Sequence, residues 1–470
     1  MRSANSLWPG VTVCSERRHP TALLVLRETR ARSARACHPY SVLSSILPAV
    51  FTGIVFVVAL VRLPAWHPSQ VWAGSWAVAT ALYALRLLPY RDLSWLTASL
   101  ICGAVVVFAV GVPLGERIAR RRQVSHRARD DMSSITLAAW LSIALLAVTL
   151  AVFLAQLVSR YGAAHVLRIS PEVKAYLSSG AGPLSATYVD AAFAATALCA
   201  LVAALSSSGR RLRWLAGAAV CAATVYFSTS RGFIVVAVIT GLAAFAAAAS
   251  HVDRRRLAVL SLAALPVILA MFIGLGSLLG KTYRNSTIGE FDNFFSRHPA
   301  VRSLALPYQD LSAGIPALDL LAGVSTTWGR AYGCATAPPA CGVLRKLGIP
   351  LVRVPVAGPF TKAPLQWNAY TFLDRFLIDG GTALCLLFVA ATGVLAGYFW
   401  ARARAGSAAA IIVYAIGLSA LISAYRQNLL QVVFFASLFG VGVLLLARNL
   451  LRFRDVLGRR LPTWSGESSR

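Results

Sequence analysis

The stretch SITLAAWLSIALLAVTLAVFLAQLV, residues 134–158, carries no charged side chain. A helix needs about 20 consecutive apolar residues to cross the roughly 30 Å hydrocarbon layer of a bilayer. This stretch is long enough, so it predicts a transmembrane helix. Similar apolar windows precede and follow it, and together they give eleven candidate spans. The windows are residues 41–62, 70–89, 95–115, 134–158, 184–206, 212–229, 232–250, 257–280, 371–400, 407–425 and 427–447.

The composition agrees with a chain that lies mostly in lipid. Of its 470 residues, 57% are hydrophobic and only 13% are charged, whereas an ordinary globular domain carries about 25% charged residues. The surplus of apolar side chains must therefore face lipid. We expect an all-α fold, namely a polytopic transmembrane helix bundle of about 10–12 spans with one large extracytoplasmic loop.

The net charge of +28 does not predict nucleic-acid binding, because the arginines lie in short connections between apolar windows and not on one soluble face. Placing these connections in the cytoplasm follows the positive-inside rule and makes all spans from residue 95 onward consistent. The segments 159–183 and 281–370 then face outward. The basic connections are residues 116–132, 207–213, 251–256 and 402–404, together with the C-terminal tail.

Two observations disagree on the orientation of the N-terminus. If all three windows before residue 95 span the membrane, counting passes puts the N-terminus outside, but the seven arginines of the first 40 residues favour the inside. Either one of these windows lies at the interface, or the chain starts upstream of the true start. We expect a disordered basic tail or misassigned start, an N-terminal transmembrane block, the large extracytoplasmic loop, a C-terminal transmembrane block and a basic cytoplasmic tail. They cover residues 1–40, 41–280, 281–370, 371–447 and 448–470, in that order.

Two of the cysteines lie in the large polar segment that we expect to be extracytoplasmic. Cysteines in an oxidising compartment can form disulfides, so Cys334 and Cys341 can close a small loop. A second group lies inside apolar windows, where a cysteine behaves as a small hydrophobe and needs no function. This group comprises Cys102, Cys199, Cys221 and Cys385.

Several familiar chemistries lack the residues that they need. The sequence has no Gly-x-x-x-x-Gly-Lys-Ser/Thr phosphate loop, no His-Glu-x-x-His and no paired Cys-x-x-Cys. An ATPase or a zinc enzyme is therefore disfavoured, and we expect neither a metal nor a cofactor. A transporter remains open, because polar residues within spans often mark substrate paths.

The segment Ser228-Thr-Ser-Arg-Gly232 lies between two apolar windows on the outward side. Arginine costs about 2.5–3.5 kcal/mol at the centre of a membrane helix and less near the interface. Arg231 can therefore be a turn residue whose side chain reaches the interface. Alternatively, a guanidinium flanked by small hydroxyl residues such as Ser230 suits phosphate oxygens, which predicts an anion clamp.

The stretch WNAYTFLDRFLIDGG, residues 367–381, opens the window that follows the large loop. Asp374, Arg375 and Asp379 lie in the first turns of a helix that must then enter lipid. At helical spacing Arg375 and Asp379 are i,i+4 neighbours and can form an ion pair. That pairing leaves Asp374 without a structural explanation.

Together these features resemble the Wzy-type oligosaccharide repeat unit polymerases. The resemblance rests on the Ser-Arg-Gly turn, the large loop in the C-terminal half, and the Asn-x-Tyr-Thr-Phe-Leu…Asp-x-Gly entry to a Gly-rich span, and it covers residues 210–447. The Asn-x-Tyr-Thr-Phe block is its most specific part. The chain departs from the family after Asp379, because Gly380 and Gly381 follow where family members often carry an aromatic residue before the glycine.

The resemblance implies a GT-C-like fold in the cytoplasmic (inner) membrane. It implies an enzyme that joins undecaprenyl-pyrophosphate-linked oligosaccharide repeats into O-antigen, capsule or exopolysaccharide at the outer face. The implied partners are these lipid-linked substrates, a flippase and a chain-length regulator. Such a transfer needs a cation to stabilise the departing pyrophosphate and a base to deprotonate the acceptor hydroxyl.

Candidates for both roles lie at the outward junctions of the predicted spans. For the base, Asp374 and Asp310 come first, followed by His298, a loop histidine whose ordinary pKa suits proton transfer. Asp190, near the outer end of a span, is a further candidate because carboxylates inside membranes are often functional. The predicted ligands for the pyrophosphate and the sugar are Arg231, Arg284, Arg426, Ser230, Asn368 and Tyr370, with Arg330 as a weaker addition.

Two other functions stay open. An O-antigen ligase-like transferase would use the same donor with a different acceptor, so the sequence does not separate it from a polymerase. A polysaccharide or lipid flippase, or another transporter, would also fit a bundle of many spans. A transporter predicts buried charges near mid-depth in several spans, whereas the charges of this chain cluster at outward junctions.

Overall fold

The computed structural model describes most of the residues in the predicted spans. The chain divides into two units, Met1–Leu43 and Ser44–Arg470, and the second contains nearly all of the described residues. The predicted span 257–280 lies almost entirely outside the description, as does the connection 251–256. The described residues are 39–121, 132–167, 172–173, 176, 182–228, 231–249, 270, 273–274, 283, 288, 291–324, 333–336, 341, 344–349, 361–362, 366–367, 371–425 and 429–460.

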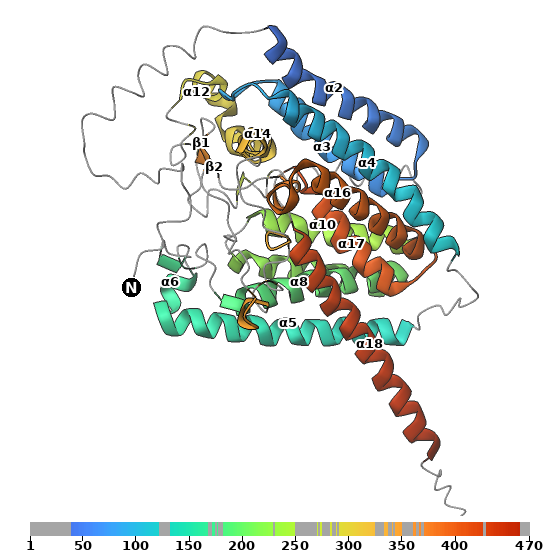
Figure 1. The fold of residues 1–470 in the computed structure, drawn as a ribbon. Coiled ribbons are helices and arrows are strands. Elements are labelled where there is room, and N and C mark those ends of the chain that lie inside the picture. The colour runs from blue at the N-terminus through green and yellow to red at the C-terminus, as the bar shows by residue number, and fades with distance from the viewer. Residues whose placement is uncertain are drawn as a thin grey trace, which may run out of the picture. The chain divides into compact units, whose positions relative to one another are not determined.

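Ten described helices coincide with ten of the eleven predicted windows (Figure 1). Six of them, namely α2, α4, α5, α8, α16 and α18, are long and apolar enough to cross a membrane, and α10 and α17 are shorter apolar helices. The described residues therefore form a multi-pass helical bundle, which confirms the predicted fold class; the predicted number of about 10–12 spans and the extracytoplasmic position of the loop stay predictions. The ten helices are α2 (Pro39–Arg62), α3 (Pro68–Ala84), α4 (Trp95–Arg121), α5 (Met132–Tyr161), α8 (Gly182–Leu205), α9 (Ser208–Thr224), α10 (Arg231–Ala248), α16 (Asp374–Arg404), α17 (Ala408–Ile422) and α18 (Leu430–Arg460).

Short elements lie between these helices. The described part of the large loop is mainly helical, and its two strands are two residues long and antiparallel, with Thr361 opposite Trp367. The short elements are α6 (Ala163–Leu167), η1 (Val225–Ser228), α12 (Phe294–Arg297), η4 (Pro299–Leu304), α13 (Ala305–Ser312), α14 (Gly314–Val324), β1 (Thr361–Lys362) and β2 (Gln366–Trp367).

The helices of the second unit run between two chemically different ends. At the first, which we call the basic end, His67 Nε2 lies 2.9 Å from Glu116 Oε1 in the last turns of α4, and the His67 ring meets Trp400 of α16 edge-on at 5.9 Å. The last turns of α4 and α16 carry paired arginines. At the second, which we call the loop end, the connection 85–94 contacts the helices of the large loop.

Helices α2, α3 and α4 pass alternately between these two ends. Ser44, near the start of α2, donates from Oγ to the Leu93 carbonyl at 2.6 Å, which places this residue at the loop end. α2 ends at Arg62, shortly before His67 at the basic end. The second unit therefore begins at the loop end. The side of the membrane that this end faces is a prediction from the charges of the chain.

α4 and α16 run parallel in close contact. Each carries a Gly-x-x-x-Gly pattern, Gly111 to Gly115 on α4 and Gly393 to Gly397 on α16. A Cβ added at Gly115 would lie 1.9 Å from the Val394 carbonyl oxygen, and one at Gly397 would lie 2.1 Å from a backbone oxygen of α4. Small residues at this spacing let two membrane helices approach closely enough for backbone contact. The pattern is visible in the sequence and was not among the predicted features.

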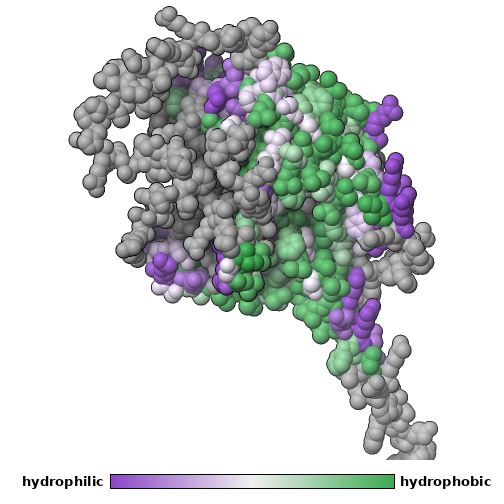
Figure 2. Space-filling view, in the orientation of Figure 1, coloured by the Kyte–Doolittle hydropathy of each residue, from purple (hydrophilic) through white to green (hydrophobic). Residues whose placement is uncertain are grey.

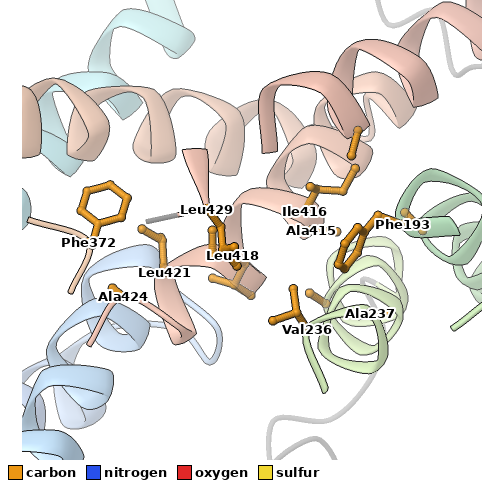
Figure 3. Packing of buried hydrophobic residues seen from close by; sticks show 14 of the residues in the cluster. Phe193, Val236, Ala237, Phe372, Ala415, Ile416, Leu418, Leu421, Ala424 and Leu429 are labelled. Atoms are coloured by element: carbon orange, nitrogen blue, oxygen red, sulfur yellow. The ribbon is translucent and has the colours of Figure 1, made fainter. Parts of the chain in front are cut away.

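α8 lies at the centre of the helices that follow α4. It contacts α5, α9, α10, α17 and α18, and residues 191–200 are all buried. Most of these residues are small, which allows close approach from several sides. Figure 3 shows Phe193 of α8, Val236 of α10 and Ile416 of α17 packed into one apolar cluster.

Large apolar side chains also cover the outside of the helices. Figure 2 shows hydrophobic residues over the helical face in view, with hydrophilic residues at its edges. Val61 of α2 is 70% exposed and Val148 of α5 is 60% exposed. Exposed apolar surface on this scale is unfavourable in water and favourable in lipid. The surface therefore agrees with the span assignment.

Candidate functional site

The helices of the large loop are fastened to the connection between α3 and α4. The Tyr308 hydroxyl donates to the Leu82 carbonyl at 2.5 Å and accepts from the Leu87 amide at 3.1 Å. Tyr90 Oη lies 3.0 Å from Ser312 Oγ, and the Tyr90 and Tyr308 rings stack at 6.4 Å. α13 is therefore held against the bundle by hydrogen bonds as well as by apolar packing.

Burial keeps these two phenols protonated. It raises the pKa of Tyr308 to about 12, and it raises the pKa of Tyr90 even further above its ordinary value. A phenol with a raised pKa stays neutral and keeps its hydroxyl proton at physiological pH. The hydrogen bonds that these two hydroxyls make therefore do not change with pH in that range.

A buried carboxylate adds a second fastening, on α14. Asp319 is 4% exposed, and its Oδ1 accepts from the Ser94 amide at 2.9 Å and from the Ser94 hydroxyl at 2.5 Å. Its Oδ2 lies 3.6 Å from Arg91 Nε. Ser94 immediately precedes α4, so Asp319 ties α14 to the start of that helix. We did not predict this residue, because it reads as a lone polar position in an apolar run.

Three segments far apart in the sequence meet at the loop end. The Phe372 amide donates to the Ala424 carbonyl at 2.5 Å, which joins the start of α16 to the end of α17. A Cβ added at Gly314, the first residue of α14, would lie 2.3 Å from the Tyr425 carbonyl oxygen and 3.5 Å from the Thr371 side chain. Thr371 belongs to the Asn-x-Tyr-Thr-Phe block and Tyr425 precedes Arg426. Two of the predicted junctions therefore converge.

Asp374 is the first residue of α16 and is buried, with 6% of its surface exposed. Its Oδ1 accepts from the Arg375 amide at 2.6 Å, and its Oδ2 lies 3.6 Å from Arg375 Nε. Beneath it, Phe372 and Phe376 pack edge-to-face with a ring separation of 5.2 Å. A buried carboxylate with a specific charged partner is a candidate for the group that accepts a proton.

Asp379 has different partners from those expected from helical spacing. Its Oδ1 accepts from the Ala335 amide at 2.9 Å, and its Oδ2 accepts from the Thr336 amide at 2.9 Å and from the Thr336 hydroxyl at 2.5 Å. Among the described residues, the ion pair recorded for Arg375 is with Asp374. The expected Arg375–Asp379 pair is replaced by these contacts, because the large loop supplies hydrogen-bond donors that the local sequence does not show.

The segment that holds Asp379 is closed by a disulfide between Cys334 and Cys341, whose Cα atoms lie 5.5 Å apart. This is the pair predicted from the sequence. Both cysteines and Ala335 are buried and pack against Ile378 of α16. The disulfide loop therefore lies directly on the first turns of α16.

Gly381 interrupts α16 with a backbone conformation of φ 74° and ψ −168°. This region is open to glycine and is strained for other residues by about 1–3 kcal/mol. The break separates the short segment Asp374–Gly380 from the long membrane-spanning part of α16. It explains why a glycine lies at position 381.

Replacing Gly381 by Ala is expected to lower the free energy of unfolding by about 1–3 kcal/mol, because alanine disfavours this φ. Thermal unfolding of the purified protein, followed by tryptophan fluorescence, measures the change. Gly417→Ala is the matched control, because Gly417 is helical in α17 and has no atom within 4 Å of an added Cβ. An equal midpoint for both variants would contradict the expectation.

The other two candidate bases differ in their surroundings. Asp310 lies on α13 and is buried, with 5% of its surface exposed. His298 is exposed at the end of α12, where its Nδ1 lies 2.8 Å from the Phe294 carbonyl oxygen and its ring stacks on Phe294 at 4.2 Å. Because a carbonyl can only accept, Nδ1 carries the proton and Nε2 is directed elsewhere. His298 is the C-cap residue of the short helix α12. Asp310 is buried to nearly the same extent as Asp374.

The predicted ligand residues fall mainly outside the described part of the chain. Arg231 is described only in its backbone, which begins α10 next to η1. Arg231 and Gly232 thus begin a helix, and the two interpretations of Arg231 stay predictions. The predicted ligands outside the described residues are Ser230, Arg284, Arg330, Asn368, Tyr370 and Arg426.

Asp190 lies in a separate groove between α8 and α18. The groove has a volume of about 450 Å³ and is lined by Thr187, Asp190 and apolar residues of α18 that include Phe435 and Phe439. It is not connected by any recorded contact to Asp374 or to the disulfide loop within the described residues. The structure therefore does not join Asp190 to the other candidates.

The described residues contain no group of three or more His, Cys, Asp and Glu side chains placed to hold a metal ion. The chemistry that they offer at the loop end is that of buried carboxylates, two adjacent guanidinium groups, those of Arg91 and Arg375, and oriented backbone amides. Comparison of the chain with family models, with curated proteins and with solved structures gives no match.

Proposed function

We propose that the chain is a membrane glycosyltransferase that joins undecaprenyl-pyrophosphate-linked oligosaccharide repeat units into a surface polysaccharide at the outer face of the cytoplasmic membrane. The observation that carries this proposal is the position of the buried carboxylates. In the part of the chain that the structure describes, the buried acidic residues are Asp310, Asp319, Asp374 and Asp379, and all four lie at the loop end. An enzyme whose substrates are held in the bilayer needs its polar groups at the interface.

The charges and the disulfide support an outward orientation of the loop end. The arginine pairs of α4 and α16 lie at the opposite end, and the positive-inside rule favours the cytoplasm for that end. The Cys334–Cys341 disulfide lies at the loop end. Disulfides persist in oxidising compartments and are rare in the cytosol. The two features thus favour the same orientation independently.

The proposed reaction forms a glycosidic bond and releases a lipid pyrophosphate. The hydroxyl oxygen of the acceptor sugar attacks the anomeric carbon of the donor, whose bond to the pyrophosphate oxygen breaks. Asp374 takes the hydroxyl proton, and the negative charge leaves on the pyrophosphate. The guanidinium groups at the outward junctions, with Arg231 first among them, would stabilise that charge. The resemblance to the Wzy-type polymerases supports this assignment of roles.

The distribution of buried charge is less suited to a transporter. A flippase or ion-coupled carrier is expected to place charged groups along a path near mid-depth. In the described helices the buried acidic residues instead lie at one end, and α8, at the centre, is buried through alanines and other small residues. A ligase would use the same lipid-linked donor as a polymerase, so product analysis must separate these two enzymes.

Deleting the gene in its own host is expected to leave surface glycolipids that carry a single repeat unit. Electrophoresis of extracted glycolipid measures the chain-length distribution, and a plasmid copy of the wild-type gene should restore the long chains. Accumulation of undelivered long chains on the lipid carrier would instead indicate a ligase. Unchanged surface polysaccharide with a defect in solute uptake would contradict both transferases.

A further inference from the structure

The carboxylate of Asp379 is held by donors that belong to a different part of the chain. All three donors come from Ala335 and Thr336, more than forty residues earlier in the sequence. Asp379 is only 1% exposed. Its carboxylate therefore receives hydrogen bonds from these donors in place of water. Hydrogen bonds to an ionised acceptor are about twice as strong as neutral ones. The contact is therefore a specific attachment and not incidental loop packing.

The donors are held in place by the disulfide. Ala335 and Thr336 directly follow Cys334 within the loop closed by Cys341. Two successive amides directed at one carboxylate need a defined backbone turn, and a cross-link restricts the loop to fewer conformations. Ile378, adjacent to Asp379, packs on the same disulfide. Apolar and polar contacts thus fix the same turn of α16.

The segment fixed in this way carries the proposed base. Gly381 breaks α16, so Asp374–Gly380 is a short piece of helix whose position does not follow from the long membrane-spanning part. One end of this piece is held by the Phe372 amide on the Ala424 carbonyl, and the other by Asp379 on Thr336. Asp374 lies between these two attachments.

We propose that Asp379 is a positioning residue, which with the Cys334–Cys341 loop holds the Asp374–Gly380 segment and so sets the place of the Asp374 carboxylate. The inference rests on the proposed function in assigning Asp374 the role of base. The structural half of the inference is the attachment of the Asp374–Gly380 segment to the disulfide loop. This attachment does not depend on the catalytic role of Asp374. A displacement of about 1 Å in a reacting group can lower a rate about 100-fold.

Hydrogen–deuterium exchange on the purified full-length chain tests the structural half. Thr336→Val keeps the shape of the side chain and removes the hydroxyl donor, and Cys334→Ser with Cys341→Ser removes the cross-link. Both variants are expected to exchange the amides of residues 371–381 at least tenfold faster than wild type. Thr149→Val is the matched control, because the Thr149 hydroxyl is bonded only to carbonyls of its own helix, α5. Unchanged exchange in both variants would overturn the attachment.

If the cysteine variant does not fold, the wild-type protein provides a second measurement. Reducing the disulfide of the purified wild-type protein with dithiothreitol, which is itself oxidised to a cyclic disulfide, should raise exchange in residues 371–381, and intact mass should report the gain of two hydrogen atoms. The same treatment of the Thr149→Val control should have the same effect. Full reduction with no change in exchange would overturn the proposal.

Elongation kinetics with lipid-linked repeat units test the positioning role. Thr336→Val is expected to lower kcat about 100-fold with little change in KM, and Thr336→Ser, which restores a hydroxyl, should recover most of the loss. Faster exchange with unchanged kcat would overturn the positioning of Asp374. If the wild-type chain elongates nothing, the proposed function fails, and the exchange experiment still decides the attachment by itself.

Discussion

Asp374→Asn is expected to lower the rate of polymer elongation by 10²–10⁴-fold, the contribution that a positioned general base makes to proton transfer. Asparagine has nearly the same shape as aspartate and can still accept from the Arg375 amide, which Asp374 Oδ1 contacts at 2.6 Å. It cannot take up a proton from the acceptor hydroxyl. The variant should therefore insert and fold normally while the long polysaccharide chains disappear.

The measurement is the chain-length distribution in a deletion strain that carries the variant, with the amount of protein in the membrane determined in parallel. Asp292→Asn is the matched control, because Asp292 lies in the large loop and pairs with Arg297 on an exposed surface. The control should support normal chain lengths. Long chains from Asp374→Asn at normal protein levels would rule out the role of base for this residue.

Asp310→Asn provides the complementary comparison. Asp310 is buried to nearly the same extent as Asp374 and lies on α13, close to the segments that converge at Gly314. Loss of elongation in Asp310→Asn alone would move the base from α16 to the large loop. His298 is the weaker alternative because its exposed ring is engaged by stacking and by a backbone carbonyl.

Hydropathy located the helices well because the bilayer imposes one requirement on every span. The predicted windows 95–115 and 427–447 correspond to α4 and α18, which continue to Arg121 and Arg460. A window marks only the apolar part of a helix. Long basic side chains reach water beyond the hydrocarbon layer, so a helix can continue past the end of its window. The sequence thus predicted where helices exist more accurately than where they end.

The candidate site was predictable only where local chemistry was unusual. Cys334 and Cys341 are identifiable because they lie in the polar segment, and Asp374 because a carboxylate precedes an apolar span. The attachment of Asp379 to Thr336 was not identifiable, because the i,i+4 rule considers only one helix and the true donors lie more than forty residues away. Asp319 was missed for the same reason, since its partner Ser94 lies 225 residues earlier.

The close contact between the parallel helices α4 and α16 contributes to the stability of the fold. The long membrane-spanning part of α16 contacts α4 through backbone atoms at Gly393 and Gly397, whereas the break at Gly381 separates the Asp374–Gly380 segment from this part. Lipid supplies little hydrophobic drive for helix association, and close packing of small residues replaces it. Substitutions at the facing glycines are therefore expected to act mainly on the fold.

Gly115→Ala is expected to destabilise the protein more than any other glycine-to-alanine change in the described helices, although it adds only one methyl group. The added Cβ would lie 1.9 Å from the Val394 carbonyl oxygen, and backbone atoms cannot rotate away as a side chain can. The two helices must separate, which loses their contacts and costs about 1–3 kcal/mol or more. Gly397→Ala should act in the same direction, because its Cβ would lie 2.1 Å from the Val112 carbonyl oxygen.

Thermal stability in detergent, measured by size-exclusion chromatography after heating, gives the comparison. Gly53→Ala is the matched control, because Gly53 lies in α2 and has no atom within 4 Å of an added Cβ; alanine there should be neutral or slightly stabilising. Since Gly115 and Gly397 act on one interface, the double variant should lose less than the sum of the two single losses. Equal stability of Gly115→Ala and Gly53→Ala would show that the two helices do not make backbone contact at this point.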